Sequence, residues 1–399
     1  MKILCVFGKN AYGDPSRGPG IEYESFIPAI KRLGHEVIFF DSWDRRKYQN
    51  FAELNQALLN IVFVERPNII LIVQRLYEIW IETLDILKRM NDVVTIYWAT
   101  DDSWKYSECS RLIGKYYDGI ITTYPGVLSK YYNDGIRNVL LLQWAANAEC
   151  LQEPLPSSSC VYPVSFIGTA HGSRKKWIKK LANRGIYINC FGYGWENGVI
   201  DERHFKKIIR ESIISINFAN SKGENQIKAR TFEVPGYGGF LLTQKAKYID
   251  KYYIDGKEIV IFDNLDDMIN KIKYYLAHPN ERDKIALAGF QRTKREHTYD
   301  KRMYDLINFA LSLKKRKNEL KNENANKPII VNNLYEKHRI TPLMAILRKI
   351  LIFLFSAIFG SERGPRAARR FLFELCWRLC KDSVYSSKGI PGRIFYKES

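Results

Sequence analysis

The residues from Arg230 to Thr243, RTFEVPGYGGFLLT, combine an arginine, a carboxylate and a glycine pair ahead of a run of β-forming residues. A carboxylate near a helix start can accept hydrogen bonds from ribose hydroxyls, and an arginine can pair with phosphate. Glycines such as Gly238 and Gly239 let the backbone approach a ligand closely. The segment is therefore typical of a nucleotide site built around Arg230 and Glu233. The alternative is an ordinary surface Arg–Glu pair at i and i+3, followed by a glycine-rich turn.

Two adjacent carboxylates, Asp101 and Asp102, follow the β-forming run Val93–Trp98. A carboxylate at the end of a strand can act as a general base that deprotonates an acceptor hydroxyl. We interpret these two residues as the candidate catalytic carboxylates. The alternative is a helix cap, because Asp102 and Ser103 precede a polar stretch.

A glycine-rich loop follows the first strand, and its residues Arg17, Gly18, Pro19 and Gly20 lead into a helical pattern. A helix N-terminus carries partial positive charge, and Arg17 adds a full one, so this loop can face reacting phosphates. We interpret Arg17, Gly18 and Gly20 as a phosphate-side loop. The alternative is a loop whose glycines only make a turn.

The elements that must position these residues alternate between short apolar runs and segments of helical spacing. The runs Ile3–Phe7 and His35–Phe40 flank a helical pattern at Glu22–Leu33, and the same rhythm continues through Ile69–Val73. This order predicts an α/β fold with parallel strands. Because the strands are continuously apolar, we expect helices on both faces of the sheet.

A Pro/Ser-rich stretch, residues 153–159, interrupts the alternation and is interpreted as a linker. A second series of strands and helices starts at Val164, which indicates two α/β domains of similar size. The expected organisation is an N-terminal domain over 1–152, a second domain over 160–300, a helix and charged connector over 301–327, and a helical tail over 328–399.

The positive charge of the chain is concentrated in its last quarter. The whole sequence has 62 Lys and Arg against 43 Asp and Glu, a formal charge of +19, and residues 301–399 carry +13 of it. Within 341–359 only ten consecutive residues, Ile350–Phe359, are uncharged, about half of a bilayer span. Apolar segments beside arginines are typical of the membrane interface. We therefore expect residues 341–380 to contact an anionic membrane surface, the alternative being a helical hairpin that packs on the protein or forms an oligomer interface.

Several other functions lack their sequence signals. The seven cysteines show no CxxC spacing, and there is no HExxH, GxSxG, Walker A or Asp-x-Asp motif. We therefore expect no resident metal and no cofactor. The first residues lack the features of a secretory signal, so a cytoplasmic location is expected. The basic charge raises a nucleic-acid-binding alternative, but the charge lies among apolar segments and no nucleic-acid motif is present, so no nucleic-acid partner is expected.

Residues 164–304 resemble the C-terminal half of the glycosyltransferase group 1 proteins, and especially their CgeB-type subset. The matching pieces are Phe166-Ile167-Gly168 with Arg174, Phe191-Gly192-Tyr193-Gly194, Ile216-Asn217, Arg230 and Glu233 with Gly238-Gly239, and Glu296-His297-Thr298-Tyr299 with Arg302. The resemblance implies a GT-B fold, in which two Rossmann-like domains face a cleft, and a nucleotide-sugar donor bound by the C-terminal half. The glycine-rich loop at Gly18 and Gly20 resembles the same superfamily more loosely.

The resemblance also implies roles for single residues. Glu233 matches the acidic residue that binds donor ribose, Arg230 would approach the diphosphate, and Gly168 with Arg174 would hold phosphate at a helix N-terminus. The other donor-side positions carried over are Gly192, Asn217, Gly238 and Gly239. The sequence departs from the family where two glutamates are normally separated by seven residues: Asn225 occupies the earlier position, and Glu224 lies one residue before it.

Taken together, these features predict a metal-independent glycosyltransferase attached peripherally to the inner face of the cell membrane. Its expected partners are a nucleotide-sugar donor and a saccharide or lipid-linked acceptor, in the synthesis of cell-envelope polysaccharide, glycolipid or glycoconjugate. The alternative that the sequence leaves open is a nucleotide-sugar-binding scaffold without catalysis, because one family glutamate is missing.

Overall fold

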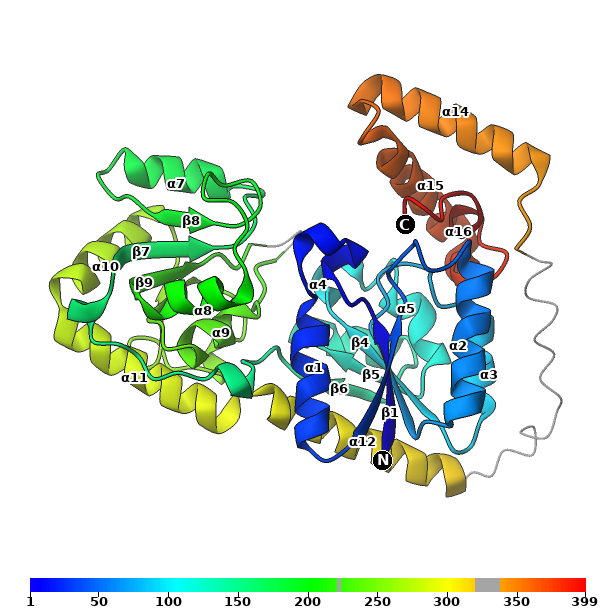
Figure 1. The fold of residues 1–399 in the computed structure, drawn as a ribbon, viewed down its shortest axis with the longest axis horizontal. Coiled ribbons are helices and arrows are strands. Elements are labelled where there is room, and N and C mark those ends of the chain that lie inside the picture. Colours follow the sequence, from blue (N-terminus) through cyan, green and yellow to red (C-terminus); the bar gives the residue numbers. More distant parts are fainter. Residues whose placement is uncertain (221–223, 320–337) are drawn as a thin grey trace. The chain divides into compact units, whose positions relative to one another are not determined.

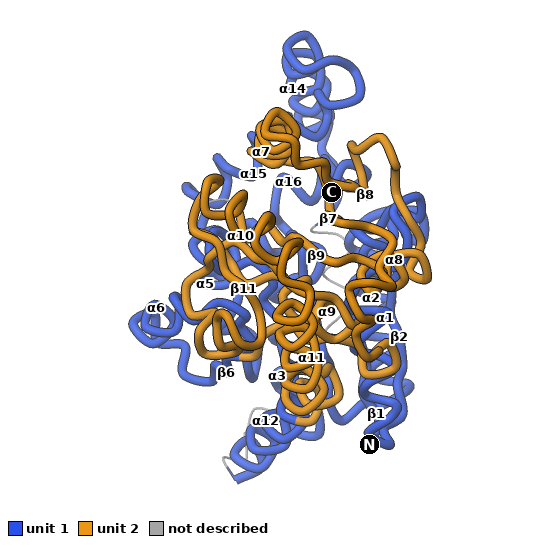
Figure 2. Tube along the Cα trace, turned by 90° about the vertical axis from the view of Figure 1, so that its left-hand side faces the viewer, with its two compact units in different colours: residues 1–141, 305–399 blue, residues 142–304 orange. Residues whose placement is uncertain are grey.

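The computed structural model describes residues 1–220, 224–319 and 338–399 (Figure 1). The chain forms two compact units, one made of residues 1–141 and 305–399 and the other of residues 142–304 (Figure 2). Each unit contains one fully parallel sheet. The predicted α/β class with two domains is therefore present.

The first unit has a six-stranded sheet of order β2-β1-β3-β4-β5-β6. The strands are β1 (Lys2–Phe7), β2 (Glu36–Asp41), β3 (Ile69–Ile72), β4 (Val94–Ala99), β5 (Gly119–Thr122) and β6 (Val139–Leu141). The helices between them are α1 (Ile21–Arg32), α2 (Phe51–Glu65), α3 (Ile81–Arg89), α4 (Asp102–Lys105), α5 (Ser110–Ile113) and α6 (Leu128–Asn133). After β2 the chain returns to the other side of β1, so the loops after β1 and β3 diverge at the carboxyl edge of the sheet, where α/β proteins bind ligands.

The second unit has a five-stranded sheet of order β11-β10-β9-β7-β8. Its strands are β7 (Tyr162–Ile167), β8 (Asn189–Phe191), β9 (Ser212–Asn217), β10 (Leu241–Gln244) and β11 (Val260–Phe262). Its helices are α7 (Arg174–Ala182), α8 (Glu202–Arg210), α9 (Arg230–Gly236), α10 (Leu265–Ala277) and α11 (Pro279–Glu296), and α12 (Tyr299–Glu319) runs on into the first unit. Here the chain reverses between β7 and β9, which places the equivalent ligand-binding point between the loops after these two strands.

The Pro/Ser stretch at 153–159 is part of the second unit and not a free linker, so that prediction was wrong. The backbone N–H of Ser157 donates to both carboxylate oxygens of Asp283 at 3.1 Å. Arg282 is fully buried, and its guanidinium donates to the backbone oxygen of Leu155 at 3.0 Å. These bonds fix the stretch against α11, and the boundary between the units falls earlier, after Leu141.

The tail is helical, as predicted, and most of it packs on the first unit. It contains α14 (Pro342–Phe359), α15 (Gly364–Cys380) and α16 (Ile390–Ile394). Leu372 and Phe373 of α15 and Phe395 after α16 are buried in the same apolar core as residues of β1, β3 and α2. This packing is the alternative considered for the tail, a hairpin docked on the protein. The part of the predicted charged connector beyond residue 319 lies outside the described residues.

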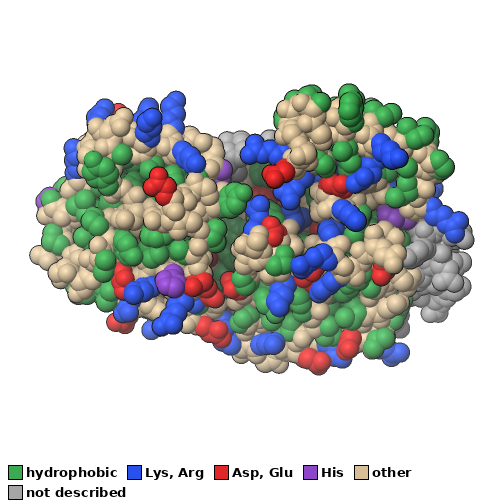
Figure 3. Space-filling model, turned by 45° about the horizontal axis from the view of Figure 1, so that its top comes forward, with side chains coloured by type: hydrophobic (Ala, Val, Ile, Leu, Met, Phe, Trp, Pro, Cys, Tyr) green, Lys and Arg blue, Asp and Glu red, His purple; other side chains and the backbone are tan. Residues whose placement is uncertain are grey.

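Helix α14 differs from the rest of the tail because it stays largely exposed. Among the described residues it is the one helix long and apolar enough to cross a membrane by length and composition, with 18 residues, a mean hydropathy of 2.0 and 6% burial. That result goes beyond the ten uncharged residues counted in the sequence. Figure 3 shows hydrophobic side chains gathered on the face that carries α14, and Phe353 and Ile358 are each 73% exposed.

Candidate functional site

Arg174 joins the two loops that diverge at the carboxyl edge of the second sheet. Its side chain, only 8% exposed, donates from Nη1 to the backbone oxygen of Thr169 at 2.9 Å and from Nη2 to that of Phe218 at 3.3 Å. Its Nε donates to Oδ1 of Asn220 at 3.0 Å. Burial, together with the nearby charge of Arg230, lowers the pKa of Arg174 to about 10. Arg174 is thus a positioned cation at the point where α/β sheets bind ligands.

Arg230 and Glu233 form an ion pair within the first turn of α9. The Nε of Arg230 donates to the backbone oxygen of Ile167 at 3.3 Å, and its guanidinium lies 4.0 Å from the ring centre of Phe205. Glu233 is buried, whereas about a third of the Arg230 side chain is exposed. The sequence left an ion pair and a nucleotide site open as alternatives. The ion pair is present, and because it stands at the carboxyl edge of the sheet it is compatible with a nucleotide site, which stays a prediction.

The loops at the same edge also contain His171 and two predicted glycines. The imidazole of His171, in the loop after β7, has a pKa lowered mainly by burial and also by the charges of Arg174 and Lys228. Gly168 and Gly192 lie in adjacent loops, and a side chain at Gly192 (φ +120°) would come within 2.6 Å of the Gly168 backbone oxygen. The two glycines therefore allow these loops to pack closely beneath the cations.

Three predicted donor residues are placed differently. Gly238 and Gly239 follow the C-terminal end of α9, so they lie a helix length away from Arg230 and lead into β10. Gly238 has a φ of +81°, and a side chain there would come within 2.8 Å of the backbone oxygen of Gln152. Asn217 is buried and donates to Oγ1 of Thr243 at 2.9 Å. The prediction that the glycine pair approaches a ligand is corrected: it makes a tight turn against the 152–153 backbone, while Asn217 ties β9 to β10.

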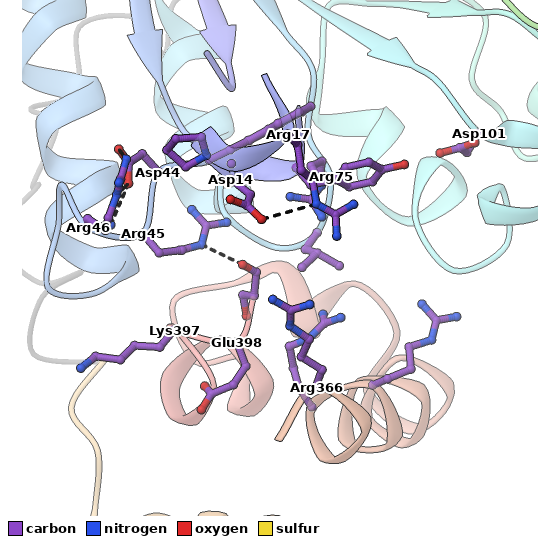
Figure 4. Close-up of a pocket in the computed structure, with 18 of the residues that line it drawn as sticks. Asp14, Arg17, Asp44, Arg45, Arg46, Arg75, Asp101, Arg366, Lys397 and Glu398 are labelled. Atoms are coloured by element: carbon purple, nitrogen blue, oxygen red, sulfur yellow. Dashed lines mark hydrogen bonds and ion pairs between the residues drawn. The ribbon is translucent and has the colours of Figure 1, made fainter. Parts of the chain in front are cut away.

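The first unit has its own cavity at the carboxyl edge of its sheet, with a volume of about 720 Å³ (Figure 4). Loops after β1, β2, β3 and β4 supply one wall, and residues of α15 and of the segment after α16 supply the other. Arg17 of the predicted phosphate-side loop lines it and pairs with Asp14 at 3.4 Å. Gly18 and Gly20 belong to the same loop, Gly20 as the residue that precedes α1.

The two predicted catalytic carboxylates have different surroundings. Asp101 lines the cavity and lies 3.7 Å from Nζ of Lys105. Asp102 is buried, and its carboxylate accepts hydrogen bonds from the hydroxyls of Ser110 at 2.5 Å, Thr122 at 2.6 Å and Tyr131 at 2.7 Å. Burial raises the pKa of Asp102 although these hydrogen bonds lower it. Asp102 therefore has a structural role that ties α4 to β5 and α6, which argues against the predicted base at this position.

Sequence reasoning missed Glu22, in the first turn of α1. It is 6% exposed, and burial raises the pKa of its carboxyl group to about 7, against the lowering effect of Arg75 and with a small further rise from Asp101. Arg75 and Asp101 both line the cavity. A carboxylate that titrates near neutral pH beside such a cavity is a second candidate base. Its position directly after the glycine-rich loop was the available signal.

Sequence reasoning also missed that the tail contributes to this cavity. Arg366, Arg369 and Arg370 of α15 line it, together with Lys397 and Glu398. The apolar segments beside these arginines had favoured a membrane surface as their partner. The structure directs them toward the first sheet instead. No group of three or more His, Cys, Asp or Glu side chains that could hold a metal ion occurs among the described residues.

The comparisons with known proteins agree with this geometry. Residues 174–308 match the family model described as glycosyl transferase-like. Spore protein CgeB of Bacillus subtilis is 22% identical over 312 residues, which cover 69% of this chain and 95% of that one. The match supports the CgeB-type glycosyltransferase family that the sequence resemblance implied.

Solved structures show the same fold at low sequence identity. HepE of Anabaena, in complex with UDP, matches at a TM-score of 0.52 and 10% identity over 78% of this chain and all of that chain. Sucrose-phosphate synthase of Thermosynechococcus elongatus matches at a TM-score of 0.53 and 10% identity over 80% of this chain and 99% of that one. A glycosyltransferase of Rickettsia africae matches at a TM-score of 0.55 and 12% identity over 81% of this chain and 99% of that one. The predicted GT-B fold is confirmed.

Proposed function

From a GT-B fold whose second unit matches the glycosyl transferase-like family, we propose that this protein transfers a hexosyl or pentosyl group from a nucleotide-sugar to an acceptor hydroxyl. The acceptor would be a saccharide or a lipid-linked saccharide in the synthesis of cell-envelope polysaccharide, glycolipid or glycoconjugate. The observation that carries the proposal is the convergence of Arg174, Arg230 and Glu233 at the carboxyl edge of the second sheet.

These residues have the chemistry that a nucleotide diphosphate requires. The two guanidinium groups supply positive charge for the phosphates, and the carboxylate of Glu233 can accept from ribose hydroxyls. The pair keeps Glu233 and Arg230 in a fixed mutual geometry, so binding does not need to order them. HepE of Anabaena was solved with UDP and with UDP-glucose, which supports a UDP-sugar as the donor.

The proposed reaction forms a bond between the acceptor oxygen and the anomeric carbon, and the bond from that carbon to the diphosphate breaks. The nucleotide diphosphate leaves with the electron pair, and Arg174 and Arg230 stabilise its charge, so we propose a reaction that is independent of metal. The hydroxyl proton passes to a carboxylate of the first unit. Asp101, one of the carboxylates that line the cavity there, is the first candidate, and Glu22 is the second.

We also propose that α14 holds the enzyme on the inner, cytoplasmic face of the membrane. Leu343, Phe353 and Ile358 are more than 70% exposed, an apolar surface that water disfavours. The charged residues Arg348 and Lys349 interrupt the apolar sequence of the helix near its middle. Arg348 pairs with Glu398 near the end of the chain. These contacts support a helix that lies along the interface and not across the bilayer.

Calorimetry with UDP, GDP and CMP tests donor binding on the full chain. We expect one nucleotide to bind, and Glu233→Ala or Arg230→Gln to weaken that binding by at least about tenfold. Glu281→Ala removes a half-buried carboxylate on α11 that accepts from the hydroxyl of Tyr274, away from Arg174 and Arg230; it is the matched control and should leave the affinity unchanged. If no nucleotide binds, or if Glu233→Ala binds as tightly as the unmodified protein, the proposal is wrong.

A nucleotide-sugar-binding scaffold is the second candidate. The observation that favours it is Asn225, which stands at the position of a family glutamate and donates from Nδ2 to the backbone oxygen of Lys245 at 2.9 Å. Release of UDP from UDP-glucose in the presence of a lipid-linked saccharide separates the two functions. An enzyme releases UDP at a rate that depends on the acceptor concentration, whereas a scaffold binds the donor and releases none.

A further inference from the structure

The cavity of the first unit is strongly basic. Nine of its lining side chains are Lys or Arg, and four are Asp or Glu. The carboxylates are already engaged: Asp14 with Arg17, Asp44 with Arg46, and Asp101 with Lys105. The fourth, Glu398, pairs with Arg348 outside the lining. The cavity therefore carries a positive charge that its own acidic residues leave uncompensated.

Arg75 is central to this charge. Its guanidinium lies between two aromatic rings, 4.9 Å from the ring centre of Tyr12 and 5.2 Å from that of Trp43. Burial lowers the pKa of Arg75; the nearby carboxylate of Glu78 opposes this shift, and the like charges of Arg45 and Arg369 add to it. No described carboxylate lies within ion-pair distance of it. A half-buried cation beside two others costs free energy unless an anion offsets the repulsion.

Arg369 supplies unused hydrogen-bond donors at the same place. Its Nε and Nη1 atoms are buried and have no hydrogen-bond partner among the described residues. Arg45 donates to the backbone oxygen of Ser42 at 2.8 Å and to an oxygen of Ser399, the last residue of the sequence, at 3.2 Å. In Figure 4, Arg45 and Arg75 of the sheet loops and Arg366 of α15 converge on the same space. Buried donors without partners are rare in native structures and mark a position where a ligand or ion is missing.

We infer that this cavity binds a phosphate or diphosphate group carried by the acceptor, with Arg75, Arg369 and Arg366 as its ligands. Planar guanidinium groups suit the oxygens of a phosphate because they can donate two parallel hydrogen bonds. The volume of about 720 Å³ lies within the range of small-molecule sites and leaves room for a saccharide beside the anion. Tyr12 and Trp104 give the cavity flat apolar surfaces for that saccharide.

The inference rests on the proposed function, because it makes this cavity the acceptor site of the transferase. The shared chemistry, a phosphate group next to a saccharide, has two sources: a soluble sugar phosphate, or a polyprenyl diphosphate in a membrane. The tail both lines the cavity and carries the exposed apolar helix α14. A lipid-linked acceptor would therefore meet its phosphate site and its membrane surface in one unit of the protein.

The test is calorimetric titration of the full chain with inorganic pyrophosphate in the presence of saturating UDP, which occupies the donor site. We expect Arg75→Gln, Arg369→Gln and Arg366→Gln each to weaken pyrophosphate binding by at least about tenfold. Lys388→Gln removes an exposed charge of the tail outside the cavity and should bind as the unmodified protein does. Arg366 is exposed, so its variant should fold normally even if the Arg75 variant does not. Pyrophosphate affinities of the Arg366 and Arg369 variants equal to that of the unmodified protein, or no binding by the unmodified protein, would overturn the inference.

Two further arms distinguish the sources and separate this inference from the proposed function. Glucose 1-phosphate in solution and polyprenyl diphosphate in neutral phosphatidylcholine vesicles are each offered to the unmodified protein and to Arg369→Gln. If the unmodified protein binds one of the two compounds and Arg369→Gln weakens that binding, the phosphate site is supported and the compound identifies its source. If the unmodified protein binds neither compound, the inference is contradicted. The Arg230→Gln variant repeats the pyrophosphate titration without UDP. If Arg230→Gln binds pyrophosphate while the unmodified protein binds no UDP, the phosphate site in the first unit is supported and the proposed donor site in the second unit is rejected.

Discussion

Arg370 of α15 donates two hydrogen bonds to the carboxylate of Glu108, at 2.9 and 3.3 Å, across 262 positions of the sequence. The Oε atoms of Glu108 thus hold the tail on the first unit. Because Glu108 is buried, removal of Arg370 leaves a carboxylate with too few donors. We expect Arg370→Gln and Glu108→Gln each to reduce the free energy of unfolding by about 1–3 kcal/mol.

Urea denaturation of the two single variants and of the double variant measures this contact. The double variant should lose clearly less than the sum of the single losses, because both remove the same interaction. Strictly additive losses would show that the two residues do not stabilise one another.

Two phenylalanines of α15 provide a matched test of tail packing. Phe373 is 2% exposed and contacts the rings of Tyr77 and Tyr385, whereas Phe371 is 48% exposed. Phe373→Ala should cost about 3–5 kcal/mol of unfolding free energy because it leaves a cavity in the core. Phe371→Ala should cost less than about 1 kcal/mol. Thermal and chemical unfolding measure both values, and similar losses in the two variants would contradict the packing of α15 described here.

The exposed face of α14 should determine membrane binding. Phe353→Asp combined with Ile358→Asp is expected to lower the fraction of protein that sediments with anionic vesicles by about tenfold, because each apolar side chain contributes free energy when it leaves water. Val64→Asp is the control, since Val64 is an exposed apolar residue of α2 at 77%. Undiminished sedimentation of the double variant, or an equal loss in the control, would show that α14 is not the membrane-binding element.

His338 should make docking of the tail sensitive to acid. It is buried, its Nδ1 lies 3.0 Å from the backbone oxygen of Ser387, and its ring centre is 4.7 Å from that of Trp80. Burial lowers its pKa to about 4, opposed by the Ser387 contact and assisted by the charge of Arg393. The unfolded chain takes up a proton near pH 6.5 but the folded chain resists it to about pH 4, so stability falls as pH drops through this window, by up to about 3 kcal/mol.

Urea denaturation between pH 7.5 and pH 4.5 tests this dependence. His338→Phe retains an aromatic ring beside Trp80 but has no titrating group, so its stability should fall less steeply with acid than that of the unmodified protein. The remaining slope includes His297, whose pKa burial also lowers to about 4. Parallel curves for the two proteins would rule out a contribution from His338.

The pH dependence of activity distinguishes the two candidate bases. If the Glu22 carboxylate accepts the acceptor proton, kcat/KM rises with pH until about 7, the pKa to which burial raises this group, and then becomes level. Glu22→Gln should abolish this rise of kcat/KM with pH and lower activity by at least about a hundredfold. If Glu22→Gln retains the rise of kcat/KM with pH and Asp101→Asn loses activity, Asp101 is the residue that accepts the proton.

The sequence was sufficient to predict the elements of both sheets and the position of Arg230 and Glu233 within one helical turn. Apolar runs such as Ile3–Phe7 and the helical spacing at Glu22–Leu33 correspond closely to β1 and α1. The spacing of Arg230 and Glu233 places both residues in one turn of a helix, which is a local property of the chain. The carboxyl ends of parallel strands share one edge, so the gathering of Arg174 and Arg230 there followed from the predicted topology.

Other features depended on contacts that no local pattern contains. Asp101 and Asp102 are adjacent and identical in the sequence, yet one lines a cavity and the other accepts from three hydroxyls that come from distant elements. Gly238 and Gly239 would also suit a loop that contacts a ligand. The close packing of Gly238 against the backbone of Gln152 shows instead that they form a tight turn.

Three properties could be predicted from the sequence alone: the α/β class, the positions of most strands and helices, and a positive charge concentrated in the last 99 residues. Periodicity and composition encode these properties residue by residue. The place of this charge depends on tertiary packing, because α15 packs on the first sheet, more than 200 residues away along the chain. That long-range packing directs Arg366 and Arg369 into the cavity, beside Arg75, and leaves the apolar face of α14 exposed.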